Sequence, residues 1–137
     1  MKVDSIMSTK VVSISADDKL DIVKDIMELA SVRHLPVVRQ GRLVGVVTQR
    51  DLLKASLSTV MGLPASEHTR FLRGISIEEV MSRPPHSIAA DATVREAARL
   101  MSEYKIGCLP VLDGDKLVGI LTETDVLSFF AQREVTS

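Results

Sequence analysis

The sequence predicts a mixed α/β protein made of two copies of one unit. Residues 3–56 align with residues 77–130 without a gap, and 16 of the 54 aligned pairs are identical, against roughly three or four expected by chance. Each copy shows the same order of local signals, β-α-β-β-α after a short helical lead-in. Two copies are too few for an open solenoid, so we expect them to pack about a pseudo-twofold axis.

The alignment also divides the chain. We assign a first repeat to residues 1–56, a connecting segment to 57–76 and a second repeat to 77–137. Gly62, Pro64 and Gly74 make the connection typical of a surface segment, with a helical turn predicted near residues 68–72. A length of 137 residues suits one globular module with a single hydrophobic core.

The first half of each repeat predicts a lead-in, an extended run and a helix. In the first copy these are a helical turn at 3–7, an extended segment at 10–14 and a helix that begins at Asp17 and Asp18. Apolar residues at helical spacing predict the buried face of that helix: Leu20, Val23, Met27 and Ala30. The second copy repeats this face with Val94, Ala97, Ala98 and Met101, and Thr93 and Glu96 have capping-box spacing.

The second half of each repeat predicts a β-hairpin followed by a helix. Runs at 35–38 and 43–47 flank Gln40-Gly41, and runs at 109–112 and 117–121 flank Asp113-Gly114, which is typical of two tight hairpins. A final helix is expected to begin near Thr48 in one copy and near Thr122 in the other.

Composition excludes several classes of protein. The net charge is −1, with 17 basic and 18 acidic residues mixed along the chain, so nucleic acid is not an expected partner. Cys108 is the only cysteine, which excludes an internal disulfide and suits a reducing, cytoplasmic location. We find no targeting segment and no apolar run long enough to span a membrane.

Metal and catalytic chemistry are not indicated either. His34 and Cys108 occupy equivalent positions in the two copies, but a transition metal needs three or four convergent ligands and no such spacing is present. No nucleophile with a neighbouring base, and no pair of carboxylates in one predicted pocket, is found. We therefore predict that the chain is not an enzyme.

A Thr-x-x-Asp motif follows the Gly-containing strand in both copies, as Thr48 to Asp51 and Thr122 to Asp125. One interpretation is a helix cap, because an acidic residue three positions after Thr binds the same backbone donors. The other is a ligand site, in which the carboxylate accepts two ribose hydroxyls and free helix N–H groups attract an anion. Recurrence next to a glycine, which lets a ligand approach closely, favours a site, and the two roles are compatible.

These motifs, together with Met7-Ser8, Leu35-Pro36-Val37 and their second copies, resemble the CBS domain over nearly the whole chain. A two-repeat chain of this kind resembles a Bateman module. The resemblance implies two clefts between the repeats for adenosyl ligands such as AMP, ADP, ATP, S-adenosylmethionine or NAD, with no required cofactor. It also implies a homodimer that signals to a regulated enzyme or transporter.

The resemblance assigns residues to each cleft. The first cleft would hold the motif of the second repeat with residues of the first, namely Thr122, Asp125, Thr9, Lys10, Val12, Arg33 and His34. The second would hold Thr48, Arg50, Asp51, Arg83, Pro85 and His86. Gly107 and Cys108 replace the basic pair there, and Arg50 compensates in part. This loss also motivates an alternative, an interaction scaffold that keeps the fold without binding a ligand.

Overall fold

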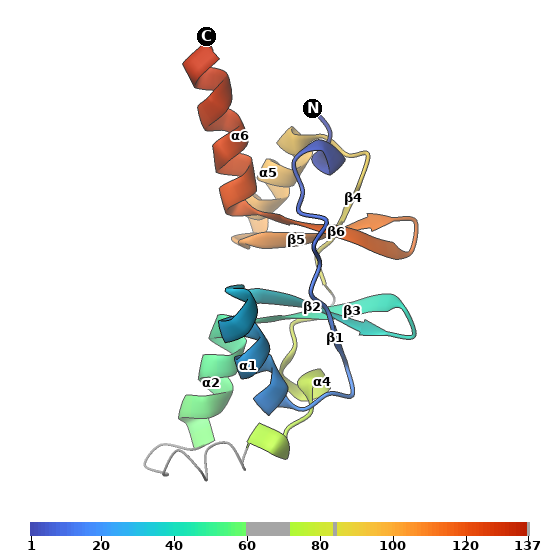
Figure 1. Ribbon diagram of the computed structural model, residues 1–137, viewed down its shortest axis with the longest axis vertical. Coiled ribbons are helices and arrows are strands. Elements are labelled where there is room, and N and C mark those ends of the chain that lie inside the picture. The colour runs from blue at the N-terminus through green and yellow to red at the C-terminus, as the bar shows by residue number, and fades with distance from the viewer. Residues whose placement is uncertain (60–71, 84, 137) are drawn as a thin grey trace. The chain divides into compact units, whose positions relative to one another are not determined.

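The computed structural model describes residues 1–59, 72–83 and 85–136, which form two compact units (Figure 1). Unit 2 is the continuous stretch Val12–Pro85, and unit 1 combines Met1–Val11 with His86–Ser137. The predicted mixed α/β class and the repeated β-α-β-β-α order are confirmed. The helical turn predicted near residues 68–72 falls on residues 68–71, which lie outside the described residues, and on Leu72, which is described.

Unit 2 is a three-stranded sheet with helices on one face (Figure 1). The short strand β1 pairs in parallel with β2, which pairs antiparallel with β3. Two long helices and a short one complete the unit. The elements are β1 (Ile14–Ser15), α1 (Leu20–Ala30), β2 (His34–Arg39), β3 (Arg42–Thr48), α2 (Gln49–Thr59) and α4 (Ile77–Val80).

Unit 1 repeats this design with the sheet order β4-β5-β6. Its strand β4 is parallel to β5, and β5 is antiparallel to β6. Its helices again lie on one face of the sheet (Figure 1). The elements are the 3₁₀ helix η1 (Val3–Ser5), β4 (Ile88–Ala89), α5 (Val94–Tyr104), β5 (Cys108–Asp113), β6 (Lys116–Thr122) and α6 (Glu123–Thr136).

Each unit has its own hydrophobic core, so the expectation of a single core is wrong. One cluster joins the sheet of unit 2 to α1 and α4, with Leu20, Leu35 and Ile77 fully buried. A second cluster does the same in unit 1 around Val94 and Leu109. A sheet covered by helices on one face encloses its own apolar side chains, which separates the two cores.

The lead-in segments are exchanged between the sequence repeats. Val3 of the first repeat is fully buried in the core of unit 1, and Ile77 of the second repeat is fully buried in that of unit 2. Backbone pairs fix both segments, Ser8 with Ile120 and Ser82 with Val46. The compact units therefore differ from the predicted repeat boundaries, because each repeat is completed by the lead-in of the other.

The helix starts follow local signals with two corrections. The capping box of α5 is present, with the Glu96 N–H donating to Thr93 Oγ1 at 3.1 Å and the Thr93 N–H donating to Glu96 Oε2 at 3.3 Å. Helix α1 instead begins at Leu20 after Lys19, because Asp18 accepts a hydrogen bond from the Ser15 N–H in the preceding turn. Ala30, predicted inward, is exposed at the last position of α1.

Two further details differ from the sequence predictions. Only Ile14–Ser15 of the extended segment at 10–14 forms a strand, since the chain passes from unit 1 to unit 2 after Val11. The second hairpin turns at 114–115, one residue later than predicted, because Asp113 pairs with Lys116. Gly114 has φ +63° there, a conformation that glycine adopts without strain.

Candidate ligand-binding site

The first Thr-x-x-Asp motif joins the end of β3 to the start of α2. The Thr48 N–H donates to Asp51 Oδ2 at 2.9 Å, and the Asp51 N–H donates to Thr48 Oγ1 at 3.1 Å. Both side chains are half-buried. The motif is therefore a reciprocal helix cap, which is the first of the two interpretations that the sequence left open.

The second motif has the same geometry in unit 1. The Thr122 N–H donates to Asp125 Oδ2 at 2.9 Å, and the Asp125 N–H donates to Thr122 Oγ1 at 3.3 Å. In each motif the cap uses only the Oδ2 oxygen of the aspartate. Within the described residues, Oδ1 of Asp51 and of Asp125 has no hydrogen-bond partner, so each carboxylate keeps one oxygen for a ligand.

Most N–H groups at these helix starts are already bonded. The first N–H of α2, from Gln49, donates to the Arg33 carbonyl at 2.8 Å, and that of α6, from Glu123, donates to the Gly107 carbonyl at 3.0 Å. Two more amides at each start belong to the cap. The expectation of several free N–H groups for an anion is therefore wrong: in the described part of the chain only those of Arg50 and Thr124 remain.

The glycine next to each motif makes room for the exchanged lead-in. A Cβ atom on Gly119 would overlap Met7 Sδ and would lie 3.0 Å from the Ser8 carbonyl oxygen. Gly45 has the same relation to Met81 and Ser82. The sequence analysis attributed these glycines to ligand approach, whereas the structure shows that they admit backbone and a methionine side chain.

The lead-in brings two predicted ligand residues into unit 1. Ser8 and Ile120 exchange backbone hydrogen bonds of 2.9 Å in both directions. Thr9 and Lys10, both exposed, follow directly, and Ile120 lies two residues before Thr122. The predicted association of Thr9 and Lys10 with the Thr122–Asp125 motif is thus compatible with the contacts inside unit 1.

The basic pair Arg33 and His34 lies in unit 2, beside the other motif. His34 pairs with Thr48 across the β2–β3 ladder, and Arg33 is exposed. In unit 1 the equivalent residue Cys108 pairs with Thr122. Assignment of Arg33, His34 and Val12 to the same site as Asp125 combines residues of both units and stays a prediction.

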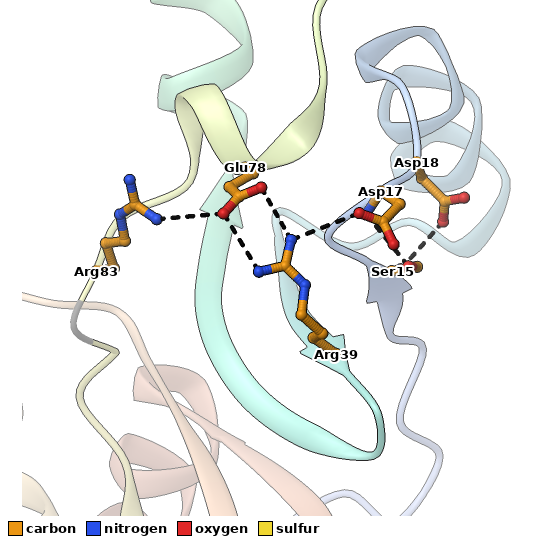
Figure 2. Close-up of polar contacts among 6 residues, drawn as sticks. All are labelled: Ser15, Asp17, Asp18, Arg39, Glu78 and Arg83. Atoms are coloured by element: carbon orange, nitrogen blue, oxygen red, sulfur yellow. Dashed lines mark hydrogen bonds and ion pairs between the residues drawn. The ribbon is translucent and has the colours of Figure 1, made fainter.

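Arg83 is engaged in a network of ion pairs in unit 2. Figure 2 shows Glu78 between Arg83 and Arg39, with Asp17 beside Arg39. Arg39 binds Glu78 through two hydrogen bonds of 2.9 and 3.3 Å and reaches Asp17 Oδ1 at 3.5 Å. Arg83 Nη1 lies 3.7 Å from Glu78 Oε1. Sequence reasoning missed this network because Arg39 has no counterpart in the second copy, where Asp113 occupies its position.

The network shifts the titration of its central pair. The hydrogen bond with Glu78, and then Coulombic attraction, raise the pKa of Arg39, while the same contacts lower the pKa of Glu78. The side chains of both residues are about 40% exposed, so solvent and salt weaken the pair. Arg83 is already paired with Glu78. A ligand that binds Arg83 must therefore compete with the Glu78 carboxylate.

The remaining candidates lie on the surface. Arg50 and His86 are exposed, Pro85 is half-buried and Val12 is 39% exposed. His86 stacks on Tyr104, with ring centroids 4.2 Å apart and an interplanar angle of 23°. Tyr104 was not among the predicted residues, although it is the only tyrosine of the chain.

Metal clusters and membrane-spanning helices are both absent from the described residues. No group of three or more His, Cys, Asp or Glu side chains is arranged to hold a metal ion among them. Among the helices that the structure describes, none combines the length and the apolar character needed to cross a bilayer.

Comparison with known families identifies the kind of domain that the chain repeats. The CBS domain family matches residues 3–58 and again residues 77–132, which together exceed half of the chain. A CBS domain-containing protein from Dictyostelium discoideum is 34% identical over 127 residues, covering 91% of this chain and 88% of the relative. This chain therefore belongs to the CBS domain family, as the sequence motifs predicted.

Solved structures agree with this assignment. The CBS domain pair of protein MJ0100, in complex with 5′-methylthioadenosine and S-adenosyl-L-methionine, matches with a TM-score of 0.81 and 28% identity over 97% of this chain and 98% of that chain. CBSX2 in complex with AMP matches with a TM-score of 0.80 and 26% identity over the same shares. Proteins of this family that are similar to this chain thus bind adenosyl ligands.

Some relatives are much longer than this chain. An uncharacterized protein from Methanocaldococcus jannaschii, MJ1225, is 31% identical, and the chain spans 47% of its length. Inosine-5′-monophosphate dehydrogenase from Korarchaeum cryptofilum is 26% identical, and the chain spans 23% of it. The chain therefore corresponds to less than half of each of these two proteins.

Proposed function

We propose that this chain is a regulatory module that binds an adenosyl ligand and transmits its presence to a partner protein. The observation that carries the proposal is the duplicated Thr-x-x-Asp motif, in which a half-buried aspartate uses Oδ2 for the cap and keeps Oδ1 for a ligand. Membership of a family whose members bind 5′-methylthioadenosine, S-adenosylmethionine or AMP supports it.

The first proposed site is built on the second motif. Asp125 would accept the ribose hydroxyls through its remaining oxygen, and Thr122 would hold Asp125 in place through the cap. Thr9, Lys10 and Val12 would line the base, while Arg33 and His34 would bind phosphate through charge-assisted hydrogen bonds. Each proposed site is assigned two Lys or Arg side chains and one His, but Arg83 of the other site is already shared with Glu78. We therefore propose this first site for AMP, ADP or ATP.

The second proposed site is built on the first motif. Asp51 and Thr48 would take the same roles, with Pro85 and His86 near the base. Arg83 and Arg50 are the cations assigned to it, and Arg83 is already shared with Glu78. Because Gly107 and Cys108 supply no charge here, we propose weaker binding of phosphates and a place for an adenosyl ligand without phosphate, such as S-adenosylmethionine.

The output of the module needs a second protein surface. We propose a homodimer and a regulated enzyme or transporter as the partner. The presence of such a pair within inosine-5′-monophosphate dehydrogenase supports the link to an enzyme. Exposed Leu53 on α2 and Leu127 on α6 occupy equivalent positions in the two copies and supply apolar surface for such contacts.

Isothermal titration calorimetry with AMP, ATP and S-adenosylmethionine tests the proposal. Asp125→Ala should abolish the tighter binding, but it also removes the cap of α6. Asp125→Asn is the matched control, because its side-chain oxygen can still accept from the Thr122 N–H while its charge is lost. We expect both variants to lose binding and Asp125→Asn to keep more of the stability; no heat with any ligand at millimolar concentration would contradict the proposal.

The alternative is a scaffold that has kept the fold and lost the ligand. The observation that favours it is the small number of free N–H groups at α2 and α6, together with the neutral Gly107 and Cys108. A thermal-shift panel separates the two functions, since a ligand that binds only the folded state raises the melting temperature. If the chain is a scaffold, no nucleotide should change the melting temperature of the parent chain, and none should change the melting temperature of Asp51→Ala or of Asp125→Ala.

A further inference from the structure

Unit 1 contains a stacked pair of exposed rings. His86 lies in the extended segment that leads into β4, and Tyr104 is the last residue of α5. Their ring centroids are 4.2 Å apart with an interplanar angle of 23°. Tyr104 is 48% exposed and belongs to neither hydrophobic core. Tyr104 therefore keeps solvent-accessible surface while its ring stacks on that of His86.

The first copy has no rings at these positions. The residues equivalent to His86 and Tyr104 are Val12 and Ala30. Three residues after Ala30 the first copy has the cation Arg33, followed by His34, whereas three residues after Tyr104 the second copy has Gly107 and Cys108. The two copies thus differ at two sets of equivalent positions. The first copy has a basic pair where the second is neutral, and the second has an aromatic pair where the first has two aliphatic side chains.

The second copy carries no charge at Gly107 and Cys108. Cys108 is buried, and burial raises the pKa of its thiol to about 12. Gly107 has no side chain, and its carbonyl is bound to the Glu123 N–H at 3.0 Å. The cation nearest to Gly107 in the sequence is Lys105, which is exposed at the C-cap of α5.

We propose that Tyr104 is a stacking residue of the site to which His86 belongs, and that this site takes an uncharged purine nucleoside in preference to its phosphates. The inference rests on the proposed function and adds the ligand class of one of its two sites. A purine base stacks on an aromatic face with a substantial free-energy gain. A phosphate finds no charge-assisted donor at Gly107 or Cys108 to replace its water. Arg83, a cation assigned to the same site, is already shared with Glu78.

The only tyrosine supplies its own reporter. The chain has one Tyr, three Phe and no Trp, so the ring protons of Tyr104 are identified in a proton NMR spectrum by comparison with Tyr104→Phe. Titration with adenosine should shift the Tyr104 ring protons upfield along a saturable curve, because a stacked purine adds its ring current. AMP and ATP should produce the same shift only at several-fold higher concentration.

Variants define the role of the ring. Tyr104→Ala should weaken adenosine binding about tenfold by calorimetry, the effect expected of one base stacked on one ring, whereas Tyr104→Phe should bind like the parent chain. Gly107→Arg, which installs the residue of the first copy, should reverse the preference in favour of AMP. Lys105→Ser, which installs the first-copy residue at an exposed position, should leave the preference for adenosine unchanged.

The outcomes separate this inference from the proposed function. Calorimetric binding of adenosine without movement of the Tyr104 protons would overturn the stacking role and leave the proposed function standing. Stronger Tyr104 shifts with AMP than with adenosine would overturn the ligand class. If no adenosyl compound binds the parent chain by calorimetry, the proposed function and this inference fail together. Unfolding midpoints of all variants show whether a loss of binding follows a loss of fold.

Discussion

At the scale of single residues, Gly119 shows how closely the exchanged segment lies on the sheet. Met7 and the Ser8 carbonyl occupy the space that a Cβ atom on Gly119 would need, and the Ser8 backbone is fixed by two hydrogen bonds to Ile120. A methionine side chain can move, but the carbonyl is held by the ladder. The position therefore tolerates a larger residue only if the lead-in shifts away from β6.

Gly119→Ala should accordingly lower the free energy of unfolding by about 1–3 kcal/mol, the usual cost of overpacking a filled site. Urea denaturation followed by circular dichroism measures it. Met7→Ala in the same chain removes the mobile part of the clash and should recover part of the loss. An unchanged midpoint for Gly119→Ala would show that the lead-in does not lie on β6 in solution.

Cys108 carries a second prediction at this scale. Burial raises the pKa of its thiol from 9.0 to about 12, so between these values the unfolded chain ionises the thiol and the folded chain does not. Stability from this group is therefore complete below pH 9 and is lost as the pH rises toward 12. Cys108→Ala should show a weaker fall of stability than the parent chain between pH 9 and 11 in urea titrations.

Reactivity of the same thiol gives an independent check. A thiol reagent attacks the thiolate, and a buried thiol with a raised pKa has little of it. We expect the folded protein at pH 8 to react with a chromogenic disulfide many times more slowly than the urea-unfolded protein. Equal rates would show that Cys108 is exposed.

At the scale of elements, the two copies differ in how their central helices begin. Helix α5 has the full Thr93–Glu96 box, whereas α1 has Lys19 at its N-cap without a side-chain hydrogen bond. Ile22, the residue equivalent to Glu96, is 40% exposed. The two helices are otherwise of equal length and bury equivalent faces, so they form a matched pair for measuring the cap.

The double substitution Lys19→Thr and Ile22→Glu should stabilise the chain by about 0.5–1 kcal/mol by giving α1 the missing cap. Thr93→Ala should cost about 1 kcal/mol for the reverse reason. Both are read from urea denaturation midpoints at neutral pH. If the double variant were less stable than the parent chain while Thr93→Ala behaved as expected, α1 would not begin where the structure places it.

The ion-pair network around Arg39 holds α4 on unit 2 (Figure 2). Its members are partly exposed, so we expect a local rather than a global effect of its loss. Glu78→Gln should speed hydrogen exchange of the Ser82 amide, and the difference should shrink at 0.5 M salt because exposed charges are screened. Glu28→Gln, on the exposed face of α1, is the control and should leave the exchange rate of the Ser82 amide unchanged at low salt and at 0.5 M salt.

Elements were predictable where the signal was local. The hairpins, the long helices and the box at Thr93 follow from residues next to one another, and duplication allowed each to be checked against its copy. The core in which Val3 and Ile77 are buried was not predictable, because nothing in the sequence of an apolar lead-in specifies the sheet on which it packs. The hydrogen bonds of the Gln49 and Glu123 amides were missed for a similar reason, since their acceptors, the carbonyls of Arg33 and Gly107, lie 16 residues earlier in the chain.

At the scale of the whole molecule, the compact units do not coincide with the sequence repeats. Val12–Pro85 contains a sheet, its helices and the α4 lead-in that completes its core. Residues 1–56 contain the same sheet without α4, and they carry Val3, which packs in the other core. Apolar area removed from water is the main favourable contribution to folding, so the two cuts of the chain should behave differently.

A fragment of residues 12–85 should therefore fold cooperatively by circular dichroism and show a dispersed amide NMR spectrum, whereas a fragment of residues 1–56 should not. Ile77→Ala within the longer fragment is the internal control, since it removes a fully buried side chain and should cost about 2–5 kcal/mol. Cooperative folding of residues 1–56 as a monomer would contradict the exchange of lead-ins.

The placement of the ligand residues follows from this exchange. The sequence located both Thr-x-x-Asp motifs, and the structure shows their caps. The sequence did not indicate the ion pair between Glu78 and Arg83 or the stacking of His86 on Tyr104. Arg39 and Tyr104 differ from the equivalent residues of the other copy, so the repeat gave no signal for either contact. Residues that break the repeat are thus where the two halves acquire separate chemistry.

The reciprocal lead-ins also bear on how such a chain originates. A polypeptide with a single repeat would carry an apolar N-terminal segment with no sheet of its own to cover, and a strand glycine facing an open position. Two identical polypeptides would satisfy one another by trading these segments, in the manner of a domain-swapped dimer. Fusion of two such genes would preserve that trade within one chain, and the side chains of each half could then change independently.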